Sequence, residues 1–423
     1  MRRGLGWRSR VRGAVATLAA LGIAASVAFV GSPASADAIR DREYWLSQYG
    51  ITAAWNTTKG AGVTIAIIDT GVDGAHIDLQ GAVVGGTDVS GIGDSDGQKP
   101  IGTSSEHGTM VGSLAAGRGH GGDSGVIGSA PAASLLSISI GFGAGTRSSD
   151  DQIADAVRWA VDNGADVINM SLTRNSLEWP RSWDDAFLYA FENDVVVVAA
   201  AGNRGSGTTE VGAPATIPGV LVVGGVDRNG KASFDASSQG ITIAVSAPSE
   251  DLVGAAPGGG YYAWAGTSGA TPIVAGIVAL VRAAHPDLDA ANVINRITAT
   301  AKSPGVEVPS PIYGYGLVDA AAAVTANVPS VSTSPAQELK DWIHLHRRAE
   351  ASPEPTPIGT PSSTPSPTPV PQAGPQSPLG TLLPTVAQLR DVGIPLLVYA
   401  VFLTLLIAWL VQVVRRVRRS RRS

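Results

Sequence analysis

The chain has 423 residues, of which 44% are hydrophobic and 15% charged, with 52 glycines, 27 prolines and no cysteine. This composition excludes wholesale disorder, a collagen-like repeat and a disulfide scaffold. Residues 37–414 carry 19 Lys and Arg against 35 Asp and Glu, a net charge of -16, so nucleic-acid binding through a basic face is not expected.

The N-terminus has the three parts of a secretory signal. Five arginines lie within residues 2–12, residues 14–30 are apolar, and Ala34-Ser35-Ala36 forms an A-x-A cleavage site. We predict a signal peptide over residues 1–36, with an uncleaved membrane anchor as the alternative. Residues 37–60 then form an N-terminal extension of the mature chain.

The pattern of residues 61–328 predicts one α/β domain. Apolar runs rich in Val and Ile are typical of strands buried on both faces; they span 63–68, 167–170, 195–201 and 220–223. Helical patterns separate them, for example at 150–163 and 182–192. This alternation predicts a mostly parallel central sheet, whose sites gather at the carboxyl ends of the strands.

Two polar side chains in the first half of this domain suit catalysis. Asp69 ends the first strand and precedes Thr70-Gly71, although an Asp that opens a turn is a common alternative. His107 begins a helix of mostly small residues (107–117, HGTMVGSLAAG), which can press close to the sheet and fix the imidazole. The other five histidines better fit surface or capping roles; they are His76, His120, His285, His344 and His346.

Two more candidates lie in the second half. Asn203 follows the strand at 195–201, and its amide can donate to an oxyanion, whereas Gly-Asn is also an ordinary turn. Ser268 precedes an apolar helix over 273–283, where unpaired helix N–H groups favour developing negative charge. A helix N-cap is the alternative role of Ser268. Pro272 is expected in the first turn, where it costs no hydrogen bond.

The C-terminal part predicts a tethered protein. Residues 329–350 form a connecting segment, and residues 351–378 contain ten prolines, which is typical of an extended stalk. After a juxtamembrane segment at 379–393, residues 394–414 carry no charge, which favours a transmembrane helix in the cytoplasmic membrane over a buried core helix. Six arginines in residues 415–423 place this basic tail in the cytoplasm and the domain outside.

The order Asp69, His107, Asn203, Ser268, with its flanking residues, resembles the subtilisin-like (S8) serine peptidases. The similar segments are 67–73 (IIDTGVD), 107–109 (HGT), 164–171 (GADVINMS) and 266–268 (GTS). The signal peptide, stalk and anchor resemble the membrane-anchored mycosin-type branch, which is associated with type VII secretion. The resemblance covers roughly residues 44–326 and implies the subtilisin-like three-layer fold, to which one C-terminal transmembrane helix is added.

The resemblance also implies a role for each candidate. Ser268 would attack the scissile carbonyl, His107 would take its proton and return it to the leaving amine, and Asp69 would orient His107. Asn203 and the backbone N–H of Ser268 would hold the oxyanion.

Substrate contacts follow from the same resemblance. Residues 137–141 and Ser171-Leu172-Thr173 are similar to the segments that pair with an extended polypeptide substrate, and Gly202 is expected beside it. Arg204 is expected at the rim of the primary specificity pocket, where it would favour an acidic side chain before the cleaved bond. Cleavage of a peptide library by Arg204→Ala and the parent would check this preference.

The sequence departs from the family pattern at Gly269, where a bulkier residue usually follows the nucleophile, and we expect a looser helix start and lower activity. Asp78 matches a family position that can ligate calcium, but residues 117–126 do not match the remaining ligands, so a capping role is expected. Zinc is not indicated, since the chain has no Cys and no H-E-x-x-H motif, and no cofactor is expected.

Together these features predict a membrane-anchored serine endopeptidase that acts outside the cytoplasm on secreted or envelope proteins. The alternative is a structural scaffold of a protein-secretion complex, with little or latent peptidase activity, whose partners would be components of that complex.

Overall fold

The strand β1 (Thr64–Asp69) shows how the sequence builds the interior. Its side chains alternate between two hydrophobic clusters, so that Ile65 and Ile67 belong to one and Ala66 and Ile68 to the other. A strand that is apolar on both faces belongs at the centre of a parallel sheet with helices on both sides.

The computed structural model describes residues 38–143 and 145–347. Seven strands form one sheet in the order β2-β5-β1-β6-β7-β8-β9, and all neighbouring pairs are parallel. The other six strands are β2 (Val83–Asp88), β5 (Ser134–Ser139), β6 (Val167–Met170), β7 (Val196–Ala200), β8 (Leu221–Val226) and β9 (Ile243–Pro248). The predicted α/β class and mostly parallel sheet are confirmed.

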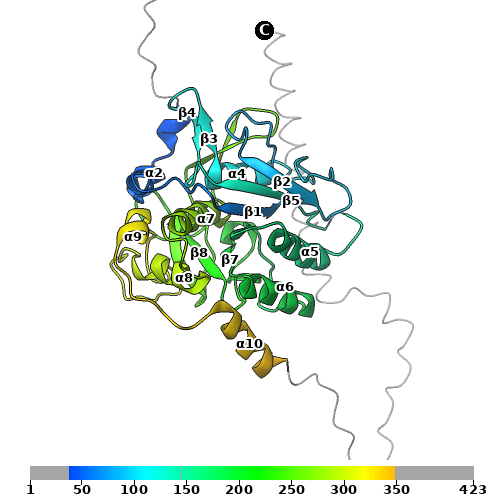
Figure 1. Cartoon of the computed structure of the whole chain (residues 1–423), viewed down its shortest axis with the longest axis vertical. Coiled ribbons are helices and arrows are strands. Elements are labelled where there is room, and N and C mark those ends of the chain that lie inside the picture. Colours follow the sequence, from blue (N-terminus) through cyan, green and yellow to red (C-terminus); the bar gives the residue numbers. More distant parts are fainter. Residues whose placement is uncertain (1–37, 144, 348–423) are drawn as a thin grey trace, which may run out of the picture. The chain divides into compact units, whose positions relative to one another are not determined.

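Helices cover both faces of the sheet (Figure 1). The helices α5 (Ser149–Asp162) and α6 (Arg181–Glu192) share the cluster of Ala66 and Ile68, whereas α4 (His107–Ala116) and α7 (Thr267–Ala284) share that of Ile65 and Ile67. This is the three-layer arrangement that the resemblance implied. The remaining helices within the described residues are η1 (Arg40–Arg42), α2 (Trp45–Gln48), α3 (Ile51–Ala54), η2 (Arg204–Ser206), α8 (Ala290–Ala299), α9 (Ala320–Thr325) and α10 (Pro335–His346).

In the part of the chain that the structure describes, two antiparallel hairpins lie outside the sheet. One joins β3 (Arg118–His120) to β4 (Ser124–Ile127), and the other joins β10 (Leu252–Ala255) to β11 (Tyr261–Trp264). The second hairpin leads directly into α7, so it borders the segment that contains Ser268.

The start of α7 differs from the sequence-based prediction. The helix begins at Thr267 with Gly266 as its N-cap, so the alternative role of Ser268 as an N-cap is wrong. Pro272 consequently lies in the second turn rather than the first, and it removes the N–H that would otherwise bond to the carbonyl of Ser268. The prediction failed because the small residues 267–271 (TSGAT) carry little hydrophobic periodicity.

Among the described residues, α7 is the one helix long and apolar enough to span a membrane, and it is 78% buried within the protein. It packs on β6, β7, β8 and β9, as a core helix does. The predicted transmembrane helix at 394–414, the signal peptide, the stalk at 351–378, the juxtamembrane segment and the basic tail lie outside the described residues.

The predicted connecting segment at 329–350 contains a helix that the sequence did not suggest. This helix, α10, packs on α6 (Figure 1), and its Leu339 is fully buried in the cluster that includes Ala66 and Ile68. Part of the segment therefore belongs to the packed body of the domain.

Candidate active site

The carboxyl ends of the central strands form the edge at which the candidate residues meet. Asp69 is the last residue of β1, whose neighbours β5 and β6 lie on opposite sides of it. Parallel strands end at a common edge, and connections that leave in opposite directions open a crevice there. His107 reaches this edge from the first residue of α4, and Ser268 from the first turn of α7.

Asp69 and His107 form a hydrogen-bonded pair. The side chain of Asp69 is fully buried, and both of its oxygens lie near His107 Nδ1, at 2.8 and 3.0 Å. A carboxylate only accepts hydrogen bonds, so Nδ1 carries the hydrogen and Nε2 of the neutral ring is left as the basic nitrogen. The backbone N–H of Thr70 donates a further bond to Asp69 at 2.7 Å.

Small residues hold α4 against the sheet, as the sequence predicted. A Cβ atom at Gly108 would overlap the carbonyl oxygen of Gly71, so only glycine permits this approach. The hydroxyl of Thr70 accepts a hydrogen bond from the N–H of Gly108 at 2.9 Å and donates one to the carbonyl of Ser105 at 3.1 Å. The residue after Asp69 thus fixes the start of the helix that carries His107.

Several effects set the pKa of His107. Burial lowers this pKa, but the negative charge of Asp69, its hydrogen bond and the charge of Glu106 outweigh that effect, so the pKa is raised above its ordinary value. The indole of Trp264 stands edge-on to the imidazole, with ring centroids 5.7 Å apart. Glu106 directly precedes His107 in the chain, whereas Trp264 could not be recognised from the sequence as a neighbour of this ring.

Reciprocal hydrogen bonds join Ser268 to Ser171. The hydroxyl of Ser268 donates to the carbonyl of Ser171 at 3.2 Å, and the hydroxyl of Ser171 donates to the carbonyl of Ser268 at 2.8 Å. The second bond uses the acceptor that Pro272 leaves free in the helix. In this state the Ser268 hydroxyl must leave its carbonyl partner before it can give its proton to His107; such bonds often form only once substrate is bound.

Asn203 is oriented by Thr267. The side-chain oxygen of Asn203 accepts hydrogen bonds from the backbone N–H of Thr267 at 2.8 Å and from its hydroxyl at 2.9 Å. These bonds leave the amide nitrogen as the available donor of Asn203. A Cβ atom at Gly266 would lie 3.0 Å from that nitrogen, which places the donor beside the residues that precede Ser268. Thr267 was missed as a functional residue, although it lies in the segment 266–268 that carried the resemblance.

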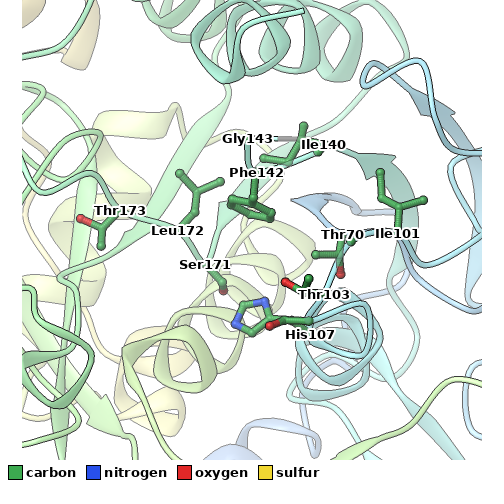
Figure 2. A pocket seen from close by; sticks show the side chains of 13 residues that line it. Thr70, Ile101, Thr103, His107, Ile140, Phe142, Gly143, Ser171, Leu172 and Thr173 are labelled. Atoms are coloured by element: carbon green, nitrogen blue, oxygen red, sulfur yellow. The ribbon is translucent and has the colours of Figure 1, made fainter. Parts of the chain in front are cut away.

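A cavity of about 540 Å³ opens beside His107 (Figure 2). In Figure 2, His107 and Ser171 lie at one end of it, and Ile140 and Phe142 lie at the other. Leu172 and Thr173, which were predicted to contact substrate, line the cavity together with Gly141. The apolar contribution of Ile101 and Phe142 had no sequence signal, because both residues belong to irregular loops.

The cavity does not include Gly202 or Arg204. Gly202 has a φ of +100°, and a Cβ atom there would lie 2.7 Å from the side chain of Thr208, so this position requires glycine. The guanidinium of Arg204 lies 4.8 Å from the ring centre of Phe234, and its Nε donates to the carbonyl of Thr209 at 3.5 Å. The expected preference for an acidic residue stays a prediction.

Neighbouring side chains occupy the space beside Gly269. A Cβ atom at Gly269 would overlap Leu252 Cδ1 and would lie 3.3 Å from Trp264 Cζ2. The space of the missing side chain is therefore filled by the β10–β11 hairpin, and the expected looser helix start and lower activity stay predictions.

Asp78, the residue at the calcium-like position, has protein partners for both oxygens. One oxygen lies 2.5 Å from His120 Nδ1, and the other accepts a hydrogen bond from the N–H of Val126 at 2.8 Å. Asp78 thus holds the β3–β4 hairpin, in keeping with the expected capping role, and His120 pairs with it rather than lying free at the surface. Residues 38–143 and 145–347 contain no group of three or more His, Asp or Glu side chains placed to hold a metal ion.

Comparisons with known proteins agree with this geometry. The profile described as the subtilase family matches residues 60–316. Subtilisin DY from Bacillus licheniformis is 40% identical over 272 residues, which cover 63% of this chain and 92% of that protein. Subtilisin E from Bacillus subtilis is 38% identical over 269 residues, which cover 62% of this chain and 66% of that protein.

Solved structures of secretion-associated proteases are similar as well. The crystal structure of MycP1 from Mycobacterium smegmatis gives a TM-score of 0.59 at 30% identity, covering 71% of this chain and 88% of that chain. The MycP3 protease from the type VII (ESX-3) secretion system gives a TM-score of 0.57 at 33% identity, covering 67% of this chain and 88% of that chain.

The Glu106 charge yields a testable prediction about His107. Glu106→Gln removes a negative charge that favours the imidazolium, so the pKa of His107 should fall. The measurement is an NMR titration of the imidazole signals. Glu307→Gln, which neutralises an exposed carboxylate elsewhere, is the matched control and should leave the titration unchanged. An equal shift in both variants would contradict the assignment of this effect to Glu106.

Proposed function

This chain belongs to the subtilase family and is a serine peptidase, and from this premise we propose that Ser268, His107 and Asp69 hydrolyse peptide bonds in polypeptide substrates. The observation that carries the proposal is the hydrogen bond between buried Asp69 and His107, which leaves Nε2 as a base on the edge where Ser268 lies.

Each residue has a chemical task in this proposal. His107 Nε2 takes the proton of Ser268 as its oxygen attacks the scissile carbonyl, and the imidazolium is stabilised by Asp69. The leaving amine receives that proton from His107, and water then releases the acyl group from Ser268 by the reverse roles. Asn203, pinned by Thr267, and the backbone N–H of Ser268 donate to the oxyanion.

The substrate is proposed to lie extended beside the residues 171–173. The cavity beside His107 adjoins these residues, and its far end is apolar, so it suits a substrate side chain on an extended backbone. Gly202 and Arg204 flank Asn203 in the segment after β7, and we propose that the primary specificity pocket lies there.

We further propose that the peptidase domain is held outside the cytoplasmic membrane by a transmembrane helix at 394–414, with the Pro-rich residues 351–378 as a stalk and the domain boundaries as predicted above. The uncharged stretch and the arginines after it support this topology. The substrates are then secreted or envelope proteins. Similarity to MycP1 and MycP3 supports components of a secretion system as partners.

Fluorophosphonate labelling of the full chain in detergent tests the nucleophile. The parent should be labelled and should cleave peptides, whereas Ser268→Ala should do neither, because the reagent needs an activated serine. Ser303→Ala changes an exposed serine and should behave as the parent. A folded parent that resists labelling would contradict the proposal. Restoration of secretion by Ser268→Ala in cells lacking the protein would instead favour the scaffold function.

Variants of Asn203 and of Thr267, which orients it, should lower kcat to different extents. Asn203→Ala should lower kcat by about 10²–10³-fold with little change in KM, which is the size established for subtilisin itself. Thr267→Val removes one of the two bonds that orient the amide and should cause a smaller loss in kcat. Thr298→Val, a matched change in α8, should have no effect on kcat; equal effects of the two threonine variants would argue against the role of Thr267.

The absence of cysteine makes the topology easy to test. Intact cells that produce Ser303→Cys should react with a membrane-impermeant maleimide, whereas cells that produce Ser423→Cys should react only after permeabilisation. Labelling of both variants in intact cells would rule out a cytoplasmic C-terminus.

A further inference from the structure

The helix α10 lies beyond the residues 60–316 that the subtilase family model matches. It packs on α6, and ion pairs join the two helices near both ends of α6. Lys340 pairs with Glu192 at the last residue of α6, at 2.6 Å, and Arg347 pairs with Asp184 in the first turn, at 2.9 Å. The two helices are therefore antiparallel. Because α6 begins near the carboxyl edge of the sheet, α10 ends near the edge that holds the candidate active site.

Arg347 closes a compact cluster at that end. Its Nε donates to Asp184, and its terminal nitrogen donates to Asp184 at 3.3 Å and to the carbonyl of Trp179 at 3.0 Å. Trp179 is itself bonded through its indole N–H to Asp184 at 2.6 Å, and its ring centroid lies 4.2 Å from that of Trp342 in α10. The Asp184 side chain is only 9% exposed, so Arg347 is its compensating charge.

This cluster supports the loop that carries the substrate-binding residues. The chain between β6 and α6 begins with residues 171–173 and ends near Trp179. Its two ends rest on adjacent residues of α6: the guanidinium of Arg174 lies 5.4 Å from the ring centre of Trp183, and Trp179 is bonded to Asp184. Arg174 also pairs with Asp150 of α5. Residues 171–173 therefore lie at one end of a loop whose other end is held by α10.

We propose that Arg347 and Trp342 are positioning residues for substrate binding, which act by holding Trp179 and Asp184 so that residues 171–173 keep the geometry that an extended peptide needs. This inference rests on the proposed function. According to this inference, α10 contributes to the affinity for long substrates, although it lies outside the residues that the family model matches. It has no part in the chemistry at Ser268.

The test uses the full chain in detergent, with a tetrapeptide nitroanilide and a single-residue ester as substrates. Arg347→Ala should raise KM for the tetrapeptide by about 3- to 10-fold, a range typical of indirect coupling, with kcat unchanged. The single-residue ester and the rate of fluorophosphonate labelling should change much less, because neither probe extends along Leu172 and Thr173, and Ser171 is held separately by its hydrogen bonds with Ser268. Trp342→Leu, which keeps an apolar contact but loses the aromatic contact with Trp179, should give the same pattern.

Lys340→Ala is the matched control, since it breaks the ion pair at the opposite end of the same two helices and should leave KM unchanged. Hydrogen exchange provides a readout independent of catalysis: Arg347→Ala, but not Lys340→Ala, should speed exchange of amides in residues 171–180. Unchanged exchange, or equal losses on both substrates, would overturn the inference. If fluorophosphonate fails to label the parent, but Arg347→Ala still speeds hydrogen exchange in residues 171–180, only the proposed function is refuted.

Discussion

A buried carboxylate governs the architecture around the site. The Asp69 side chain is fully buried at the end of β1, and an uncompensated charge there would cost several kcal/mol. Its partners are the N–H of Thr70 and the Nδ1–H of His107, and the second partner can be reached only if α4 begins within hydrogen-bonding distance. The glycine contact between Gly108 and Gly71 and the small residues of α4 follow from that requirement.

The interaction between Asp69 and His107 favours stability and reactivity in different pH ranges. The folded state raises the pKa of His107, so protonation of this ring favours folding. That contribution is fully present below the unfolded pKa of about 6.5 and is lost as the pH rises through the higher folded value. The base that takes the proton of Ser268 is the neutral imidazole, so the site is most reactive where this contribution to stability is absent.

The sequence predicted the parts of the molecule that depend on local pattern. The strand at 63–68 could be found because its residues are apolar on both faces, and α5 because its apolar residues recur with helical spacing. The start of α7 could not be found in this way, because residues 267–271 have no clear hydrophobic periodicity and are positioned by contacts with Asn203 and Ser171. The helix α10 was not predicted for a similar reason. Its residue Trp342 and the following Arg347 contact Trp179 and Asp184, which lie more than 150 positions earlier in the chain.

The packing of Trp264 against Gly269 constrains how this site can change over evolutionary time. The Cβ of a larger residue introduced first at position 269 would overlap Leu252 Cδ1 and lie in tight contact with Trp264 Cζ2, at 3.3 Å. A smaller residue introduced first at position 264 would leave a cavity and remove a ring from the side of His107, at a cost of about 3–5 kcal/mol for a fully buried Trp→Ala change and less for this half-buried one. Because the closest obstruction is Leu252 Cδ1, positions 252, 264 and 269 are expected to vary together among relatives, with a change at 252 preceding any larger side chain at 269.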